Sequence, residues 1–360
     1  MSDHLFHNMP AITIGLVTYN RIAMLREAVR SVLDQSFKDF LLLIGNDYPE
    51  VPVTFDVLGI DPDPRIHIIN HEKNLGQIAN LNYLLNASSS KWFTWLGDDD
   101  LFHPEFLRQL HHVAKEHQET DVSAVYCGYF SSALRPEVFQ PLDSPVRGEL
   151  LSSPEFILNY TARKYHLIGC YALLNTEALK AVKGLPQLGN SFSPYCDTLL
   201  PILLAEHGDI CWVDEPLVFL RTHAESESVS SSDFEGYTTA ESDFLRELRR
   251  VCSSARVNMR EDECVKHIVF WFIFNEWGVL LRTPSLNWFS ASRKFILYQF
   301  RINLPRLAPG FWLQCFFYSL RVMLRRSTYH AHTWCINSKR RILGTLHVGS
   351  HQRLNEIHLK

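Results

Sequence analysis

Short apolar runs alternate with segments of helical periodicity along the first 127 residues, and this alternation constrains the fold more than any other feature. The apolar runs have the length of buried strands, and they fall at residues 12–17, 40–44, 66–69, 92–96 and 122–127. The segments between them carry apolar residues three and four apart, as in Ile22, Leu25 and Val29. The alternation predicts an α/β fold with a mainly parallel sheet flanked by helices on both faces.

Polar residues follow several of these runs directly. Thr18, Tyr19 and Asn20 follow the first, Asn46 and Asp47 the second, and Asp98, Asp99 and Asp100 the fourth. Ligands of open α/β sheets bind outside the carboxyl ends of the strands. The sequence therefore predicts a site for a polar ligand at this edge.

The second half of the chain continues the pattern and then changes character. We expect strands at 168–174, 210–213 and 217–220, a helix at 196–207, and caps at Asn20 and Thr176 for the helices that follow them. Beyond a serine-rich loop at 225–233 only aromatic-rich helical patterns remain. We predict a catalytic domain at 1–235, a helical extension at 236–330 and a basic tail at 331–360.

The three adjacent carboxylates suggest a metal site. Like charges repel, and a divalent cation with its preference for oxygen ligands relieves that repulsion. On an extended segment, Asp98 and Asp100 would point the same way and share a site. The alternative is a solvated acidic turn, or a cap for the helix that Pro104 is expected to open.

From about residue 11 to 224 the sequence resembles the family 2 glycosyltransferases of the GT-A fold. The resemblance rests on the order and spacing of five segments, TYNR at 18–21 with SVLDQSF at 31–37, ND at 46–47, NLGQ at 74–77, WLGDDDLFHP at 95–104 and CDTLLPILLAEHG at 196–208. It implies an inverting enzyme that transfers a sugar from a nucleotide-sugar, with UDP as the expected nucleotide, to a glycan or lipid-linked acceptor.

The resemblance also implies roles for the donor site. Tyr19, flanked by Thr18 and Asn20, would stack on the base, and Asp47 would accept a hydrogen bond from the base edge. The turn formed by Asn74, Gly76 and Gln77 would line the same nucleotide-sugar site. Asp98 would contact the ribose, and Asp100, together with Asp99, would hold Mn²⁺ or Mg²⁺ against the diphosphate.

Asp197 matches the general base, which takes the proton of the attacking hydroxyl. Its alternative role is an acid in the first turn of a helix, where the helix dipole favours it. His223, in FLRTH at 219–223, matches a histidine that reaches the metal or diphosphate. Because the chain has 17 histidines, a structural role for it stays open.

Three positions depart from the family pattern. Asn46 replaces the first of a usual aspartate pair, Leu81 replaces an arginine expected to touch the diphosphate, and Cys196 replaces the acidic residue before the base. The change at Leu81 puts one diphosphate contact in question. The change at Cys196 puts in question how the general base, Asp197, is oriented and how its basicity is set.

Charge is unevenly distributed along the chain. After Glu276 there are 13 basic residues and a single acidic one, Glu356, although the whole chain carries a net charge of −4. Residues 311–326 place Trp312, Phe316 and Met323 on one side of a helix with basic residues toward the other. This pattern suits peripheral binding to an anionic membrane. The alternative is packing against the acidic first domain, within one chain or in a homo-oligomer.

Composition and absent motifs argue against several other classes of protein. The eight cysteines form no CxxC pair, and no apolar run is long enough for a spanning helix or placed as a signal peptide, so we expect a cytoplasmic protein. The first strand lacks the GxGxxG of a dinucleotide-dependent dehydrogenase and the glycine-rich loop of a nucleotidyltransferase. No nucleic-acid-binding motif is recognisable, so nucleic acid is not an expected partner. The rival function is a nucleotide-sugar-binding protein of this fold without activity.

Overall fold

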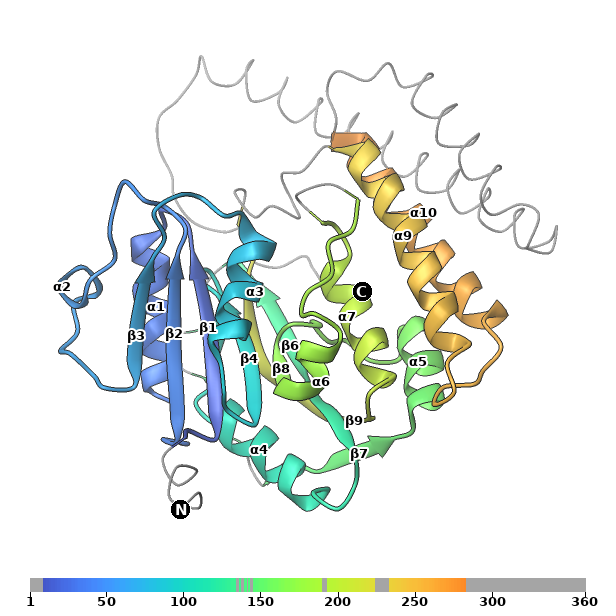
Figure 1. The fold of residues 1–360 in the computed structure, drawn as a ribbon, viewed down its shortest axis with the longest axis horizontal. Helices are drawn as coiled ribbons and strands as arrows, with labels where there is room; N and C mark the ends of the chain where they lie inside the picture. Colours follow the sequence, from blue (N-terminus) through green and yellow to red (C-terminus); the bar gives the residue numbers. More distant parts are fainter. Residues whose placement is uncertain are drawn as a thin grey trace, which may run out of the picture. The chain divides into compact units, whose positions relative to one another are not determined.

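The computed structural model describes residues 9–282 apart from 134–135, 137–138, 141, 143–144, 190–192 and 224–232. Its core is a nine-stranded sheet, counted over these residues, in the order β3-β2-β1-β4-β8-β6-β9-β5, with β7 paired to β9 (Figure 1). The strands are β1 Ile12–Thr18, β2 Phe40–Asn46, β3 Ile66–Asn70, β4 Trp92–Gly97, β5 Leu101–Phe102, β6 Val122–Ser132, β7 Gly148–Leu151, β8 Ala172–Asn175 and β9 Asp209–Arg221.

The first half of the sheet confirms the expected parallel arrangement. Strands β3, β2, β1 and β4 are all parallel neighbours, and each begins at or within a residue of its predicted position. The run that we expected at 168–174 is strand only from Ala172, and the two strands expected at 210–220 are one continuous β9.

The second half of the sheet is mixed. Strand β8 lies antiparallel between β4 and β6, and β5 and β7 pair antiparallel with β9, while β6 and β9 are parallel. Because β8 reverses the direction twice, β6 and β9 run in the same direction as β4. Among the described residues, β1, β2, β3, β4, β6 and β9 therefore share one direction, and the expected mainly parallel sheet is confirmed.

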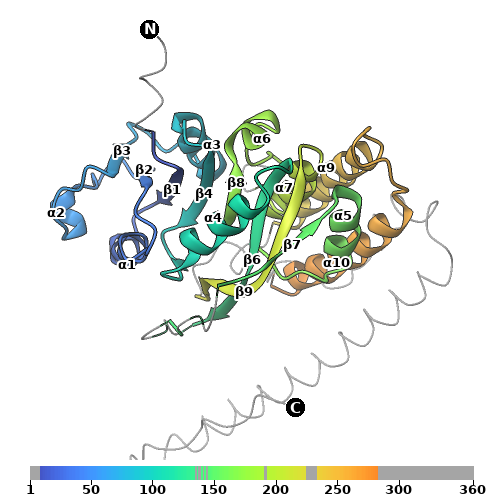
Figure 2. The ribbon, with the colours of Figure 1, turned by 90° about the horizontal axis from the view of Figure 1, so that it is seen from below.

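Helices cover both faces of this sheet. They are α1 Ile22–Leu33, α2 Phe55–Leu58, α3 Gln77–Ala87, α4 Phe106–Glu116, α5 Ser153–Thr161, α6 Thr176–Ala181, α7 Cys196–Ala205, α9 Phe234–Cys252 and α10 Asp262–Arg282. Figure 2 shows α1 on one side of the sheet and α3 and α6 on the other. Apolar side chains of α1 and α4, including Leu25, Val29 and Leu110, form one buried cluster with β1, β2 and β6.

Two predicted helix caps are wrong. Asn20 has a left-handed φ of 54° and stands one residue before the N-cap position, which Arg21 occupies without a side-chain cap. For α6 the cap is Asn175, whose Oδ1 accepts hydrogen bonds from the backbone N–H groups of Glu177 and Ala178. An amide oxygen at this position can reach two N–H groups, so Thr176 is the first helical residue instead.

The helices after residue 233 pack on the rest of the described chain. Helix α9 contacts α7, and α10 contacts both α9 and α5. The start of α9 coincides with the boundary expected near residue 235, yet residues 1–287 form one compact unit. The basic region expected to bind membrane, including residues 311–326, lies outside the described residues. None of the described helices is both long and apolar enough to cross a membrane.

Candidate functional site

The predicted site edge is formed by β1, β2 and β4. In the parallel register Thr18 lies beside Asn46, and Val17 lies beside Gly97, so the three strands end at the same level. The residues that follow them therefore converge, as the strand-end argument predicted. Asp47 and the aspartates at 98–100 come from separate segments but share this edge.

Asp98 is buried, with a side chain that is 0% exposed. Its Oδ2 accepts a 2.7 Å hydrogen bond from the Thr18 hydroxyl, and its Oδ1 lies 2.7 Å from Nη2 of Arg21. The Arg21 contact is an ion pair whose angle is not that of a hydrogen bond, since Oδ1 has no hydrogen-bond donor among the described residues. Burial raises the pKa of Asp98 to about 6, against the opposing charge of Arg21 and the Thr18 hydrogen bond. The hydrogen bond between Thr18 and Asp98 thus connects the ends of β1 and β4 at the site.

Asp99 contacts both Arg21 and His223. Its Oδ2 lies 3.1 Å from Nη1 of Arg21 and 3.0 Å from Nε2 of His223. Its side chain is 19% exposed and that of His223 is 15% exposed, so both remain accessible. Nδ1 of His223 is buried and has no hydrogen-bond partner among the described residues.

Asp100 is held by groups from two distant strands. The Tyr171 hydroxyl donates a 2.6 Å hydrogen bond to Oδ2, and the backbone N–H of Arg221 donates a 2.9 Å hydrogen bond to Oδ1. Burial and then the charge of Asp99 raise the pKa of Asp100 to about 7, while these hydrogen bonds lower it. Near neutral pH this carboxyl can exchange a proton, and a bound cation would keep it ionised.

The expectation that Asp98 and Asp100 share a site does not match this geometry. Asp98 and Asp99 stand in a turn rather than an extended segment, so side chains two apart do not point the same way. Asp98 binds Thr18 and Arg21, whereas Asp100 binds Tyr171 and Arg221. Arg21 instead bridges Asp98 and Asp99.

Asp47 organises the glycine-containing turn. Its two carboxylate oxygens accept hydrogen bonds of 2.7 and 2.9 Å from the backbone N–H groups of Leu75 and Gly76. Oδ1 of Asn74 accepts from the Gly76 N–H as well, and Gly76 has a φ of 87° at the N-cap of α3. Asn74, Gly76 and Gln77 are exposed beside Asp47. Asp47 and the glycine-containing turn are therefore in direct contact.

Tyr19 presents an exposed ring near this turn. The ring is 50% exposed and meets Tyr48 edge to face at 5.1 Å between centroids. An aromatic ring held in this way offers a face on which a base can stack. Tyr48 was not predicted, although it follows Asp47 directly.

Two of the departures from the family pattern have structural roles. Asn46 is buried, and its Nδ2 donates to the carbonyl oxygens of Tyr48 and Val51 and to Oδ1 of Asn70. An amide can donate where a carboxylate cannot, so Asn46 supports the loop that carries Asp47. Leu81 is buried, so it is part of the packed interior.

Asp197 lies in the first turn of α7. It retains some exposed surface, yet protein atoms surround its carboxyl group closely, and this burial raises its pKa. Burial, and then the charges of Asp197 and Asp100 among others, raise the pKa of the Cys170 thiol, so Cys170 lies near both carboxyl groups.

The residues present fit the implied Mn²⁺ or Mg²⁺ only in part. No three His, Cys, Asp or Glu side chains of the described part surround one metal position. Mg²⁺ at nucleotide sites is usually held by one or two carboxylates, with phosphates and water completing its shell. Accessible Asp99 and His223, next to Asp100, fit a cation that arrives with a diphosphate.

Sequence reasoning missed three residues that hold the aspartates. Arg21 and Arg221 belong to the quoted motifs TYNR and FLRTH without an expected role, and Tyr171 carries no signal. Nε of Arg221 also donates to the Asp99 carbonyl oxygen, and its Nη2 pairs with Glu27 at 2.6 Å. The backbone and side chain of Arg221 therefore fix both ends of the Asp99–Asp100 segment.

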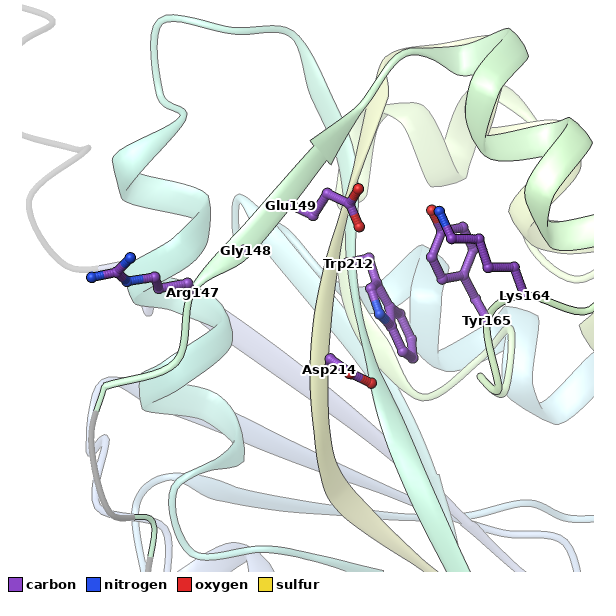
Figure 3. Close-up of a pocket in the computed structure, with 7 residues that line it drawn as sticks. All are labelled: Arg147, Gly148, Glu149, Lys164, Tyr165, Trp212 and Asp214. Carbon is purple, nitrogen blue, oxygen red and sulfur yellow. The ribbon is translucent and has the colours of Figure 1, made fainter.

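A surface cavity of about 380 Å³ lies elsewhere (Figure 3). It is lined by Arg147, Gly148, Glu149, Lys164, Tyr165, Trp212 and Asp214. None of the predicted site residues belongs to it. The site at the strand ends is defined by its side chains rather than by this cavity.

Comparison with known proteins gives a family match for part of the chain. Residues 13–182 match the family described as Glycosyl transferase family 2. YwdF of Bacillus subtilis, an uncharacterized glycosyltransferase, is 34% identical over 110 residues, which are 31% of this chain and 39% of that protein. An uncharacterized glycosyltransferase of Haemophilus influenzae is 25% identical over 236 residues, or 66% of this chain and 76% of that protein.

Solved structures give a more distant likeness. The structure of S. aureus TarS 1-349 in complex with UDP-GlcNAc has a TM-score of 0.48 and 15% identity, and covers 80% of this chain and 88% of that chain.

The mixed α/β sheet flanked by helices has the architecture of the GT-A fold. Residues 13–182, a little less than half of the chain, match the family 2 glycosyltransferases. The alignments span 36%, 18% and 39% of three of the curated relatives, so they cover a minor part of those proteins. The family match ends at residue 182, before Asp197.

Proposed function

We propose that the protein is an inverting glycosyltransferase that uses a UDP-sugar and transfers the sugar to a hydroxyl group of a glycan or lipid-linked acceptor. The observation that carries the proposal is the convergence of Asp47 with Asp98, Asp99 and Asp100 at the strand ends of a family 2 domain. Carboxylates gathered at one edge suit a divalent cation, and such a cation can bind the diphosphate of a nucleotide-sugar.

The donor half of the site is formed by β1, β2 and β4 and their loops. Tyr19 stacks on the base, and Asp47 accepts a hydrogen bond from the base edge next to the turn that it already holds. Asp99 contacts the ribose in place of Asp98, because Asp98 is buried against Thr18 and Arg21. Asn74, Gly76 and Gln77 line the open side of the donor.

Asp100, Asp99 and His223 would hold Mn²⁺ or Mg²⁺. When bound, the cation supplies positive charge that stabilises the departing diphosphate. Tyr171 and the Arg221 N–H keep the Asp100 carboxylate oriented through their hydrogen bonds. Arg21, which already pairs with two aspartates, provides a further positive charge near the diphosphate.

The acceptor half of the reaction depends on Asp197. As the acceptor oxygen bonds to the anomeric carbon, Asp197 takes the hydroxyl proton, and the bond from that carbon to the diphosphate breaks with its electron pair leaving on UDP. Direct displacement inverts the anomeric centre. Burial, which raises the pKa of Asp197, makes it a stronger base than an exposed aspartate once ionised.

Calorimetric titration with UDP and with UDP-sugars, in Mn²⁺ and then in EDTA, tests the donor site. We expect binding that depends on the metal, and a severe loss of affinity in Asp100→Asn. Asp262→Asn is the matched control, because Asp262 has a 58% exposed side chain outside the site. Equal affinity in Mn²⁺ and EDTA would reject the metal role.

A screen of nucleotide-sugars for metal-dependent UDP release, without any acceptor, tests catalysis. We expect slow hydrolysis of the true donor, since water can replace the acceptor hydroxyl. Binding of a UDP-sugar with no release from any donor, even in the presence of glycan and lipid-linked acceptors, would favour the inactive binding protein.

A further inference from the structure

Arg163 occupies an unusual environment at the end of α5. Its backbone has a left-handed φ of 64°, which bulky residues seldom adopt. Nε and Nη2 of its guanidinium are buried, and neither has a hydrogen-bond partner among the described residues. A buried cation without acceptors is unfavourable for folding alone.

The Arg163 guanidinium lies over the ring of Trp271. Its Cζ is 3.9 Å from the ring centroid, a distance at which the cation is attracted to the ring face. Trp271 belongs to α10, outside the segment that matches the family. Helix α10 therefore holds the Arg163 guanidinium in position through Trp271.

Trp271 also contacts the turn that precedes Asp197. Its ring centroid lies 5.0 Å from that of Tyr195, and the neighbouring Phe272 lies 4.5 Å from the same ring. Tyr195 has a left-handed φ of 69° at the N-cap of α7, two residues before Asp197. The Trp271 indole thus contacts both the Arg163 guanidinium and Tyr195, whose backbone leads into the helix turn that carries Asp197.

A second link joins α5 to the first turn of α7. The Tyr160 hydroxyl donates a 3.1 Å hydrogen bond to the Thr198 carbonyl oxygen. Since Thr198 follows Asp197 and Arg163 follows Tyr160 by three residues, this bond holds the two charged groups near each other. The ion pairs of the described residues include no direct Arg163–Asp197 pair, so the guanidinium acts on the carboxylate from a greater distance.

The charge of Arg163 acts on Asp197. Burial raises the pKa of Asp197, and the Arg163 guanidinium opposes that effect. The other titratable groups around Asp197 are Tyr160 from α5, Cys170 before β8 and Cys196 on α7, all with pKa values raised by burial. From α9, Tyr237 packs on Tyr195, and Glu241 is buried one turn further along. The phenols and thiols are neutral at pH 7.

We propose that Arg163 and Trp271 are positioning residues for Asp197. Trp271 holds both the guanidinium and the Tyr195 turn, and the guanidinium charge keeps the Asp197 carboxylate ionised and ready to accept the acceptor proton. This inference rests on the proposed role of Asp197 as general base. It gives the C-terminal helices a part in catalysis, although every residue of the proposed donor site precedes those helices.

The test measures UDP release from UDP-glucose and UDP-N-acetylglucosamine with Mn²⁺ as a function of pH, in the full-length protein. In Arg163→Gln we expect the acid limb of the rate profile to move up by about one pH unit, because the carboxylate loses a stabilising charge. Arg163→Lys retains the charge and should keep the wild-type midpoint. Trp271→Leu should shift the midpoint in the same direction as Arg163→Gln, and Trp271→Phe should restore most of the rate.

Controls separate positioning from folding and donor binding. UDP affinity in Mn²⁺, measured by calorimetry, should stay within about twofold in all four variants. Arg260→Gln is the matched surface control, because Arg260 is 92% exposed and should behave as wild type. Arg163→Lys keeps the positive charge and Trp271→Phe keeps an aromatic ring. These two variants therefore test the proposal even if Arg163→Gln or Trp271→Leu disturbs folding.

Two results would overturn the proposal. The first is an unchanged pH midpoint and rate in Arg163→Gln, and the second is an Arg163→Lys profile shifted as far as that of Arg163→Gln. Either result, in a protein that turns over a donor, defeats only this inference. A wild-type protein that binds UDP but releases none from any donor defeats the proposed function, and this inference with it.

Discussion

Gly169 packs directly against the backbone of Asp197. A Cβ atom at Gly169 would lie 1.7 Å from the Asp197 carbonyl oxygen and 2.9 Å from Cδ of Pro201. No side chain fits there without moving the start of α7. We predict that Gly169→Ala displaces Asp197 and lowers kcat by about 100-fold, while calorimetry shows little change in UDP affinity.

The control for this substitution is Gly59→Ala. Gly59 has a φ of 69°, but a Cβ atom added there would have no neighbouring atom within 4 Å. The substitution should cost about 1 kcal/mol of stability without changing kcat. A Gly169→Ala variant with wild-type kcat would show that catalysis does not depend on the exact location of Asp197.

Asp197→Asn should abolish sugar transfer and leave donor binding nearly intact. A general base contributes typically about 10²- to 10⁴-fold to rate, and none of the proposed donor contacts involves Asp197. Turnover with the true acceptor and UDP affinity should be measured in parallel. Near wild-type turnover, or retention of the anomeric configuration in the product, would rule out this assignment.

Tyr171→Phe should weaken metal-dependent UDP binding at low pH more than at high pH. The Tyr171 hydroxyl donates to Asp100 and lowers its pKa, so its loss favours the protonated acid. We expect affinity to fall about tenfold at pH 6.5 and to recover by pH 8.5. Tyr83→Phe, at a 46% exposed position on α3, is the control. A loss of affinity independent of pH would indicate a steric effect instead.

The ligand-free protein should lose stability as pH rises from about 4 to 7. Aspartates titrate near 3.9 in an unfolded chain, whereas Asp98 and Asp100 have pKa values of about 6 and about 7 in the fold. Between these limits the native state binds more protons than the unfolded state, so the free energy of unfolding falls with rising pH. The decline should be on the order of a few kcal/mol and measurable by urea titration.

Asp100→Asn removes one of these titrations and should make the decline shallower, while Asp262→Asn should leave it unchanged. Saturating UDP with Mn²⁺ should also flatten it, because the bound cation favours the ionised carboxylates. A stability that rises over this pH range in the wild-type protein would contradict the assignment.

The basic region after Glu276 predicts binding to anionic membranes. Each basic side chain near such a surface contributes roughly 1 kcal/mol, and thirteen follow Glu276 in the sequence. The full-length protein should float with anionic vesicles at low ionic strength, and replacing Arg321, Arg325 and Arg326 by glutamine should reduce flotation. Absence from anionic vesicles under these conditions would favour packing within the chain or a dimer.

The parallel half of the sheet was predictable because each of its strands is a continuous apolar run that ends in polar residues. Periodicity carries no information about direction, so the antiparallel insertion of β8 does not follow from the sequence pattern. Strand β5 has only two residues, and β7 lies in a stretch without a clear pattern. Both depend on pairing with β9 rather than on their own sequence.

The acidic members of the site were predictable for the same reason, since they follow strands directly. Their partners were not, because Arg21, Tyr171 and Arg221 contact the aspartates across 78, 71 and 121 residues. The sequence also does not distinguish a turn from an extended segment at 98–100, so the directions of these side chains do not follow from it. In the turn, the Asp98 side chain is fully buried, whereas that of Asp99 is 19% exposed.

The hydrogen bond from Arg221 to Asp100 has a consequence for synthesis of the chain. A ribosome adding about 5 to 20 residues per second needs roughly 6 to 24 seconds to make the 121 residues that separate the two partners. During that interval the emerging N-terminal strands can pair, but the acidic segment lacks the donor from β9. Nascent chains should therefore acquire nucleotide affinity late, only after residue 221 has left the exit tunnel.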